Sequence, residues 1–184
     1  MTRIIAICGK KRSGKDTIAN YISEKYGYEN VKFANILKGL CKAAFTLSDL
    51  QLEDSEKDVI DTRYDKTPRQ IMQYIGTDLM QFEMQKFIPK IGRLVWTSSL
   101  LESTKDKFII ISDMRFKHEA EEVLRYDPSA LIVMVDRLMC KDNVDAHVSE
   151  HEFMDIPFNV TVKNNSGIEQ LYARIDSFMK TSRI

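Results

Sequence analysis

The fold of this chain is decided by one stretch near its start, Arg3-Ile4-Ile5-Ala6-Ile7-Cys8-Gly9-Lys10-Lys11-Arg12-Ser13-Gly14-Lys15-Asp16-Thr17. Its first six residues are almost wholly apolar and rich in β-branched side chains, which is typical of a parallel strand buried on both faces. Residues 9–15 have the form G-x-x-x-x-G-K, and residues 16–26 repeat apolar side chains at helical spacing before Gly27 ends the pattern. A strand, a glycine loop and a helix in direct succession predict a phosphate-binding loop in an α/β protein.

The loop has the parts that hold a nucleoside triphosphate. Glycines let backbone N–H groups turn inward around a phosphate, the helix amino terminus adds partial positive charge, and Lys15 can reach the β- and γ-phosphates. Lys10, Lys11 and Arg12 supply more positive charge than a triphosphate requires, so one or two of them could face an acceptor phosphate, the alternative being solvated surface. We therefore assign ATP to the donor-binding residues Gly9, Lys10, Lys11, Arg12, Ser13, Gly14, Lys15, Asp16 and Thr17.

The end of the loop departs from the commonest form of this motif. Asp16 stands where a Ser or Thr usually binds Mg²⁺, and the hydroxyl comes one step later at Thr17. This G-K-x-T form resembles the loops of nucleoside monophosphate kinases more than those of GTPases or motor ATPases. We expect Mg²⁺ to bridge the β- and γ-phosphates, with no side chain assigned as its ligand; whether Asp16 or Thr17 approaches it stays open.

Composition limits the partners. The 184 residues include 27 Lys and Arg against 27 Asp and Glu, so no overall field attracts nucleic acid or a membrane, and we expect neither as a partner. The three cysteines are widely spaced and odd in number, which argues against a disulfide framework and a zinc cluster. No apolar run approaches the roughly 18 residues of a membrane span, and the amino terminus lacks the pattern of a signal peptide, so we expect a cytoplasmic protein.

Strands and helices alternate along the rest of the chain. Residues 108–112 and 131–135 are continuous apolar runs separated by the amphipathic stretch 117–126, which predicts a βαβ unit. Residues 31–33 and 160–162 are shorter strand candidates. The pattern predicts a three-layer α/β P-loop fold with a parallel sheet of about five strands, in a single domain spanning residues 1–184.

Further helices are predicted at 34–45, at 68–87 and around 168–178. The second should begin at Pro68 with Thr67 as its cap, and Gly76 makes an unbroken helix less certain there. Residues 48–65 form a less regular acidic stretch.

Candidate catalytic side chains follow two of the strands. Ligands of open α/β sheets bind beyond the carboxyl ends of the strands, where Asp113 and Arg115 follow residues 108–112. Asp113 could hold a water on Mg²⁺ or orient the acceptor, and Arg115 could grip a phosphate, the alternative being an ion pair with Glu119. Arg137 ends the next strand and opens a polar stretch suited to a lid at about residues 137–152, where closure would bring its charge to the transferred phosphoryl group. The predicted catalytic residues are Lys15, Arg12, Asp113, Arg115 and Arg137.

An acceptor site is predicted around residue 69. Arg69 lies at a helix start with Gln73 one turn later on the same face, a pair able to hold a phosphate and a base edge. An exposed helical face is the alternative. Trp96 could stack on a base or fill a core.

Five collinear blocks span most of the chain, at residues 9–17, 33–38, 67–78, 113–119 and 147–150. Together they resemble the deoxynucleoside monophosphate kinases of large bacteriophages and DNA viruses. The resemblance implies transfer of the γ-phosphoryl group of ATP to a dNMP, an acceptor lobe at about residues 34–100 and a lid. It also implies that Lys38, Arg69, Gly76, Thr77 and Trp96 lie around the acceptor nucleotide, to which the roles described above add Gln73 and Arg115. In P-loop kinases the loop that corresponds to residues 164–167 often borders the adenine, so Asn164 is a candidate for the donor base.

Two positions depart from the family pattern. Gln81 stands where relatives often have an arginine, and Asn35 replaces a residue that precedes a proline in them. The acceptor is therefore less certain than the chemistry, and a kinase similar to phosphomevalonate kinase or dephospho-CoA kinase remains an alternative. A P-loop switch that hydrolyses nucleotide without a small acceptor is another. A homodimer is left open.

Overall fold

The computed structural model describes residues 3–53, 55–138 and 155–181. A parallel five-stranded sheet lies at its centre, with the strand order β2-β3-β1-β4-β5. This confirms the predicted sheet. The strands are β1 (Arg3–Cys8), β2 (Glu29–Val31), β3 (Phe108–Ile111), β4 (Leu131–Asp136) and β5 (Val160–Lys163).

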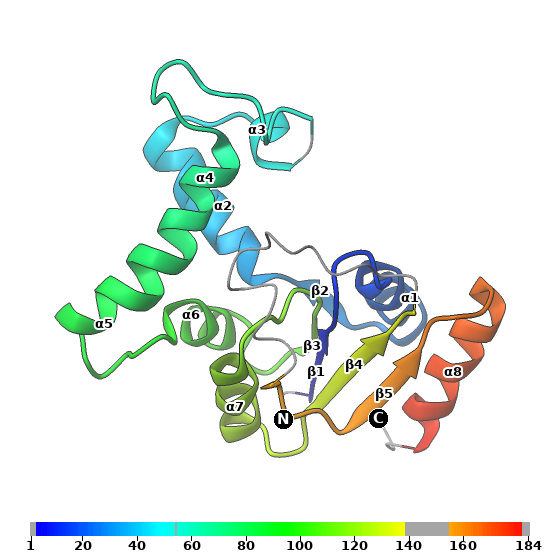
Figure 1. Ribbon diagram of the computed structural model, residues 1–184. Helices are drawn as coiled ribbons and strands as arrows, with labels where there is room; N and C mark the ends of the chain where they lie inside the picture. The colour runs from blue at the N-terminus through cyan, green and yellow to red at the C-terminus, as the bar shows by residue number, and fades with distance from the viewer. Residues whose placement is uncertain (1–2, 54, 139–154, 182–184) are drawn as a thin grey trace. The chain divides into compact units, whose positions relative to one another are not determined.

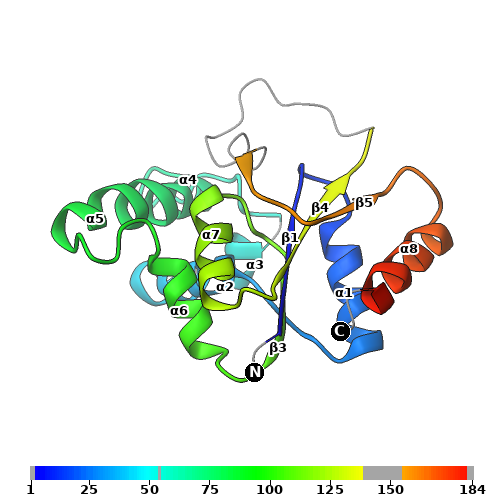
Figure 2. The same ribbon diagram turned by 90° about the horizontal axis from the view of Figure 1, so that it is seen from below.

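Helices cover both faces of the sheet and so make three layers (Figures 1 and 2). Helices α1 (Lys15–Tyr26) and α8 (Ile168–Thr181) lie on one face, and α7 (Lys117–Tyr126) lies on the other. The core on the α1 side is built from β-branched strand residues such as Ile5 and the buried stripes of both helices, including Ile18 and Ile175. This packing fixes the carboxyl end of β1, where the phosphate loop begins.

The chain forms two compact units, residues 1–32 with 101–184 and residues 33–100. The second unit has its own core, which includes Cys41, Leu52 and Ile71. Whether it is the acceptor lobe expected at about residues 34–100 stays a prediction. Its helices are α2 (Phe33–Phe45), α3 (Asp49–Glu53), α4 (Pro68–Gln73), the π-helix η1 (Tyr74–Glu83), α5 (Met84–Phe87) and most of α6 (Val95–Ser103).

The helix predicted from Pro68 is confirmed at its start. Thr67 caps it and Gln70 completes a capping box, with Pro68 in the first turn. Around Gly76 the helix continues as the π-helix η1 rather than breaking. π-helices are rare, and the short π-turns found within α-helices are frequently at functional sites.

One strand prediction was displaced and two helices were missed. The second strand is Glu29–Val31, not 31–33, because Glu29 to Val31 pair with Ile109 to Ile111 of β3, and Phe33 already begins α2. Helix α3 was missed, although Ser48 and Gln51 bond reciprocally through side chain and backbone N–H, as a capping box does. Helix α6 was also not predicted.

Candidate functional site

The glycine loop joins β1 to α1, and its backbone needs its glycines. Gly9 has φ 138° and Gly14 has φ 102°, in the region that favours glycine. A Cβ on Gly9 would lie 2.7 Å from the carbonyl oxygen of Val135, so only glycine lets the loop rest against β4. Arg12 also has a positive φ of 64°. The loop is therefore a strained turn that neighbouring elements hold in place.

Lys15 closes the loop from within. Its Nζ donates to the carbonyl oxygens of Gly9 and Lys10, at 2.8 Å each. The amino terminus of α1 has no side-chain cap, so its partial positive charge faces the loop. The Ser13 hydroxyl is buried and has no hydrogen-bond partner among the described residues. A phosphate chain fits these features, because it would bring acceptor oxygens to an orphaned hydroxyl, an ammonium and a helix terminus.

Two further predicted residues touch the same loop. Arg137 Nη1 donates to the carbonyl oxygen of Arg12 at 3.2 Å, and Asn164 Nδ2 donates to that of Ser13 at 2.7 Å. The backbone N–H of Asn164 donates to the backbone carbonyl oxygen of Asp136 at 2.7 Å, which fixes Asn164 beside the end of β4. The structure therefore brings Arg12, Lys15, Arg137 and Asn164 together. Their catalytic and binding roles stay predictions.

The segment after β3 carries Asp113, which is partly buried, and Arg115, which is exposed. It is held by Glu119, whose Oε2 accepts the backbone N–H groups of Arg115 at 2.8 Å and Phe116 at 3.0 Å. An ion pair between Arg115 and Glu119 was the alternative role that the sequence left open for Arg115. In the structure, the backbone N–H of Arg115 makes the contact with Glu119. Burial raises the pKa of Glu119 to about 7, although both N–H bonds favour the ionised form. Sequence reasoning missed this positioning role; a glutamate in the first turn of the helix predicted at 117–126 is the signal that could have indicated it.

The remaining side chains of the loop lie at its surface. Lys11, Arg12 and Thr17 are exposed, and Asp16 is paired with Lys32 at 2.5 Å. Within residues 3–53, 55–138 and 155–181, no three His, Cys, Asp or Glu side chains are grouped so as to hold a metal ion.

The predicted acceptor residues all lie in the 33–100 unit except Arg115. Arg69 is paired with Asp58 and Lys38 with Glu53, while Gln73 is partly buried.

Gly76 and Thr77 are buried in η1. Trp96 is only 6% exposed, and its indole N–H donates to the carbonyl oxygen of Gly76 at 2.8 Å. A Cβ on Gly76 would lie 2.7 Å from Leu37 Cδ2, so η1 packs closely on α2 there. Trp96 therefore supports the π-helix, and stacking on a base stays a prediction.

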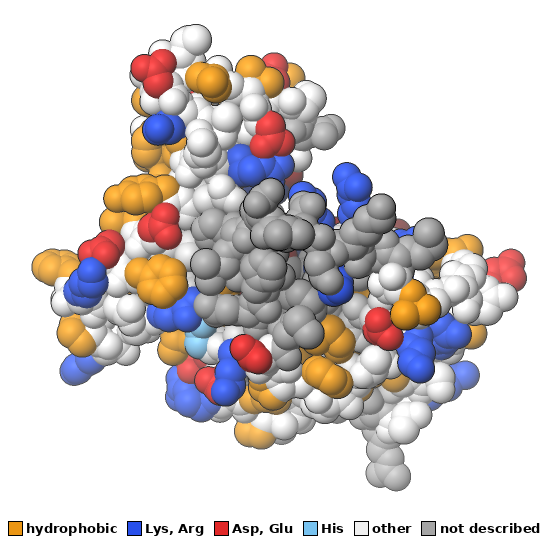
Figure 3. Space-filling model, in the orientation of Figure 1, with side chains coloured by type: hydrophobic (Ala, Val, Ile, Leu, Met, Phe, Trp, Pro, Cys, Tyr) orange, Lys and Arg blue, Asp and Glu red, His pale blue; other side chains and the backbone are white. Residues whose placement is uncertain are grey.

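The expected lid at about residues 137–152 lies outside the described residues, apart from Arg137 and Leu138. Cys8 and Cys41 are buried free thiols. No helix in the described part of the chain has the length and apolar character to span a membrane. Acidic and basic side chains are interspersed over the face drawn in Figure 3.

A lysine-closed glycine loop between the first strand and first helix of a parallel five-stranded sheet defines a P-loop kinase fold. Solved kinases share it. Dephospho-CoA kinase from Campylobacter jejuni matches with a TM-score of 0.52 at 14% identity, covering 98% of this chain and 96% of that one. Shikimate kinase from Aquifex aeolicus matches with a TM-score of 0.50 at 15% identity, covering 98% of both chains. At such identities the likeness concerns the fold alone.

The family follows from sequence. The model of the deoxynucleotide monophosphate kinase family matches residues 3–62 and 49–175, and this chain belongs to that family. A protein of Acanthamoeba polyphaga mimivirus, provisionally named as a deoxynucleotide monophosphate kinase, is 31% identical over 185 residues, covering 95% of this chain and 94% of that protein. The chain is accordingly a nucleotide kinase, a nucleotide-binding phosphotransferase.

Proposed function

We propose that this kinase transfers the γ-phosphoryl group of ATP to a deoxynucleoside monophosphate, giving ADP and a deoxynucleoside diphosphate. The observation that carries the proposal is the loop closed by the Lys15 ammonium, in a chain whose family is defined by deoxynucleotide monophosphates. Positioning and charge stabilisation supply most of the catalysis in phosphoryl transfer, and the loop is built for both.

On the donor side, Lys15 and the loop N–H groups would hold the β- and γ-phosphates. Arg12 and Arg137, already joined through the Arg12 carbonyl, would place positive charge beside the transferred group. When bound, Mg²⁺ would neutralise charge between the two phosphates, and Asp16 or Thr17 of the loop could approach it. Because Asp16 is exposed and its pair with Lys32 lies at the surface, it could be released for that purpose.

On the acceptor side, Arg69 and Lys38 would bind the monophosphate, with Gln73 available for a base edge. Arg115 would add a second guanidinium near the donor loop, since β3 is the neighbour of β1 in the sheet. Asp113 would orient the acceptor or hold a water on the metal. We place the reaction in the cytoplasm, where the buried thiols Cys8 and Cys41 stay reduced.

The test is a coupled assay of ADP release with ATP and a panel of acceptors: the four common dNMPs, their ribonucleotide counterparts, mevalonate 5-phosphate and dephospho-CoA. ADP release that depends on a dNMP and saturates with it is the expected result. Release that requires mevalonate 5-phosphate or dephospho-CoA instead would replace the proposed acceptor. Release that is independent of every acceptor would identify a nucleotide-hydrolysing switch.

A further inference from the structure

The segment between α3 and α4 takes part in two bidentate pairs of aspartate and arginine: Asp61 with Arg63 inside the segment, and Asp58 with Arg69 at the start of α4. Asp61 accepts from Nε and Nη2 of Arg63 at 2.9 and 2.6 Å, and Asp58 accepts from Nε and Nη2 of Arg69 at 2.5 and 2.9 Å. The Asp61 side chain is 5% exposed, whereas the Asp58 side chain is 68% exposed. The two pairs therefore have similar hydrogen bonds, but one carboxylate is buried and the other is open to solvent.

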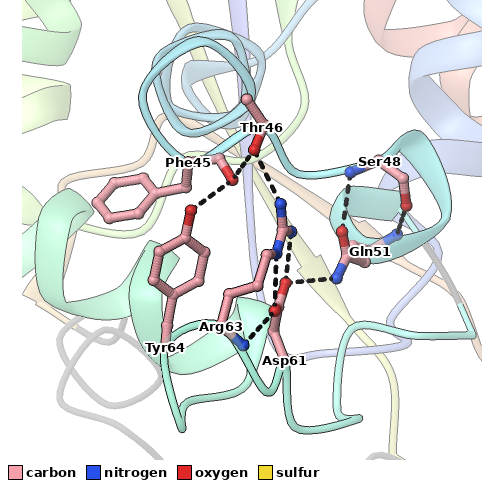
Figure 4. Close-up of polar contacts among 7 residues, drawn as sticks. All are labelled: Phe45, Thr46, Ser48, Gln51, Asp61, Arg63 and Tyr64. Carbon is pink, nitrogen blue, oxygen red and sulfur yellow. Dashed lines mark hydrogen bonds and ion pairs between the residues drawn. The ribbon is translucent and has the colours of Figure 1, made fainter.

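The Asp61 pair is a fixed anchor (Figure 4). Besides the guanidinium, Asp61 accepts the backbone N–H of Arg63 at 3.0 Å and Nε2 of Gln51 at 2.8 Å. Arg63 also donates to Thr46 at 2.8 Å, which ties the segment to the end of α2. These bonds hold the pKa of Asp61 well below its usual range, with Arg63 as the main cause. A buried carboxylate with this many donors is not readily exchanged.

The Asp58 pair has the character of an exchangeable contact. Both partners are substantially exposed, the Arg69 side chain to 40%, so water and salt compete for it. A guanidinium binds a phosphate dianion in the same bidentate geometry and with more charge than a carboxylate offers. A phosphate could therefore offer Arg69 acceptors for the two hydrogen bonds that Asp58 now receives.

Lys38 and Glu53 form a second ion pair with an exposed carboxylate. Lys38 Nζ is 2.5 Å from Glu53 Oε2, and the Glu53 side chain is 59% exposed. Lys38 and Arg69, which we expect to bind the acceptor phosphate, are thus each paired with an exposed carboxylate. The two carboxylates, Glu53 and Asp58, are five residues apart in the chain, and the Asp61 anchor holds the segment that follows them.

We propose that Asp58 and Glu53 stand in for the acceptor phosphate and set its affinity: they hold Arg69 and Lys38 ready, and the incoming monophosphate displaces them. The inference rests on the proposed function. By this exchange, Asp58 and Glu53 would make the enzyme select phosphorylated acceptors, because an unphosphorylated nucleoside has no anion that could replace the two carboxylates. Only a phosphorylated acceptor would engage both cations.

Calorimetric titration of Asp58→Asn with dNMP and with ATP separately tests this. Removing the competing charge should tighten dNMP binding about two- to fivefold, the range set by exposed ion pairs, and leave ATP binding unchanged. Glu53→Gln should act in the same direction. Asp49→Asn is the matched control, because it breaks the exposed Lys42–Asp49 pair at 2.6 Å with the same change in net charge. In an Arg69→Ala background the effect of Asp58→Asn should vanish.

The outcomes separate the inference from the function on which it rests. Unchanged or weaker dNMP binding by Asp58→Asn, with its melting temperature retained, would make Asp58 a positioning residue for Arg69 and overturn the exchange. Equal tightening by Asp49→Asn would reduce the effect to net charge and overturn it too. Failure of the wild-type protein and all variants to bind any dNMP would remove the proposed function itself.

Discussion

Glu119→Gln should change how stability depends on pH, because Glu119 is a buried carboxyl group whose pKa is raised chiefly by its burial. Only 4% of Glu119 is exposed, and Oε2 accepts the two backbone N–H groups that fix the segment of Asp113 and Arg115. Glutamine preserves the shape and offers an amide oxygen to the same N–H groups. The substitution therefore removes the titration with little change in packing.

The sign and size follow from the pKa. Burial is the largest influence and raises the pKa of Glu119 from 4.5 to about 7, so the folded protein keeps this proton in a range where the unfolded chain has lost it. The contribution to stability is complete below pH 4.5 and is lost as pH rises towards and through 7. At 1.36 kcal/mol for each pKa unit, the loss is on the order of 3 kcal/mol.

Urea unfolding of both proteins at pH values from 5 to 8.5 measures the effect. The free energy of unfolding of the wild type should fall by about 2–3 kcal/mol relative to the variant across this range, since some titration precedes pH 5. Equal slopes in urea for the two proteins would confirm that the comparison is valid. A difference that does not vary with pH would show that Glu119 stays ionised throughout, with its two N–H bonds outweighing burial.

Three further substitutions test the site. Lys15→Ala should lower kcat to below about one tenth of wild type while circular dichroism stays unchanged, since the ammonium serves the loop rather than the core; a higher residual kcat would exclude the P-loop mechanism. Arg69→Ala should raise KM for the dNMP roughly tenfold to a hundredfold through loss of a charge-assisted bond of about 1.5–3 kcal/mol, and equal changes in KM for ATP would place Arg69 elsewhere. Gly14→Ala should weaken ATP binding and lower the free energy of unfolding by about 1–3 kcal/mol. The reasons are that φ of Gly14 is 102° and that the Asn164 amide occupies the place of the new Cβ. An unchanged melting temperature would contradict this.

The fold was predictable because its signals are local. Continuous apolar runs marked β1, β3 and β4, and glycines marked the loop and the end of α1, so these elements fell close to their observed bounds. The edge strand β2 was displaced because three residues carry little periodicity and its place depends on pairing with β3. Pairing partners far apart in sequence are invisible to local patterns.

The contacts of the site were less predictable. Lys15 follows from the motif, but the sequence offers no signal that Arg137 and Asn164 each reach a carbonyl of the same loop more than 120 residues away. The carboxylates of Glu53 and Asp58 belong to residues 48–65, for which the sequence predicts only an acidic, irregular stretch. Their partners depend on how the 33–100 unit packs, which no spacing rule supplies.

The bonds made by Arg137 and Asn164 orient two peptide planes of the glycine loop. In a trans peptide the C=O and the following N–H point in opposite directions. The carbonyls of Arg12 and Ser13 are turned to Arg137 and Asn164, so the N–H groups of Ser13 and Gly14 point the other way, and that of Ser13 indeed meets the Lys10 carbonyl across the loop at 3.2 Å. Asn164 thus orients the Ser13–Gly14 peptide of the loop that we propose binds phosphate. A loss of ATP affinity on replacing it would follow from that orientation even without a contact to adenine, whereas a change in preference between ATP and GTP would require one.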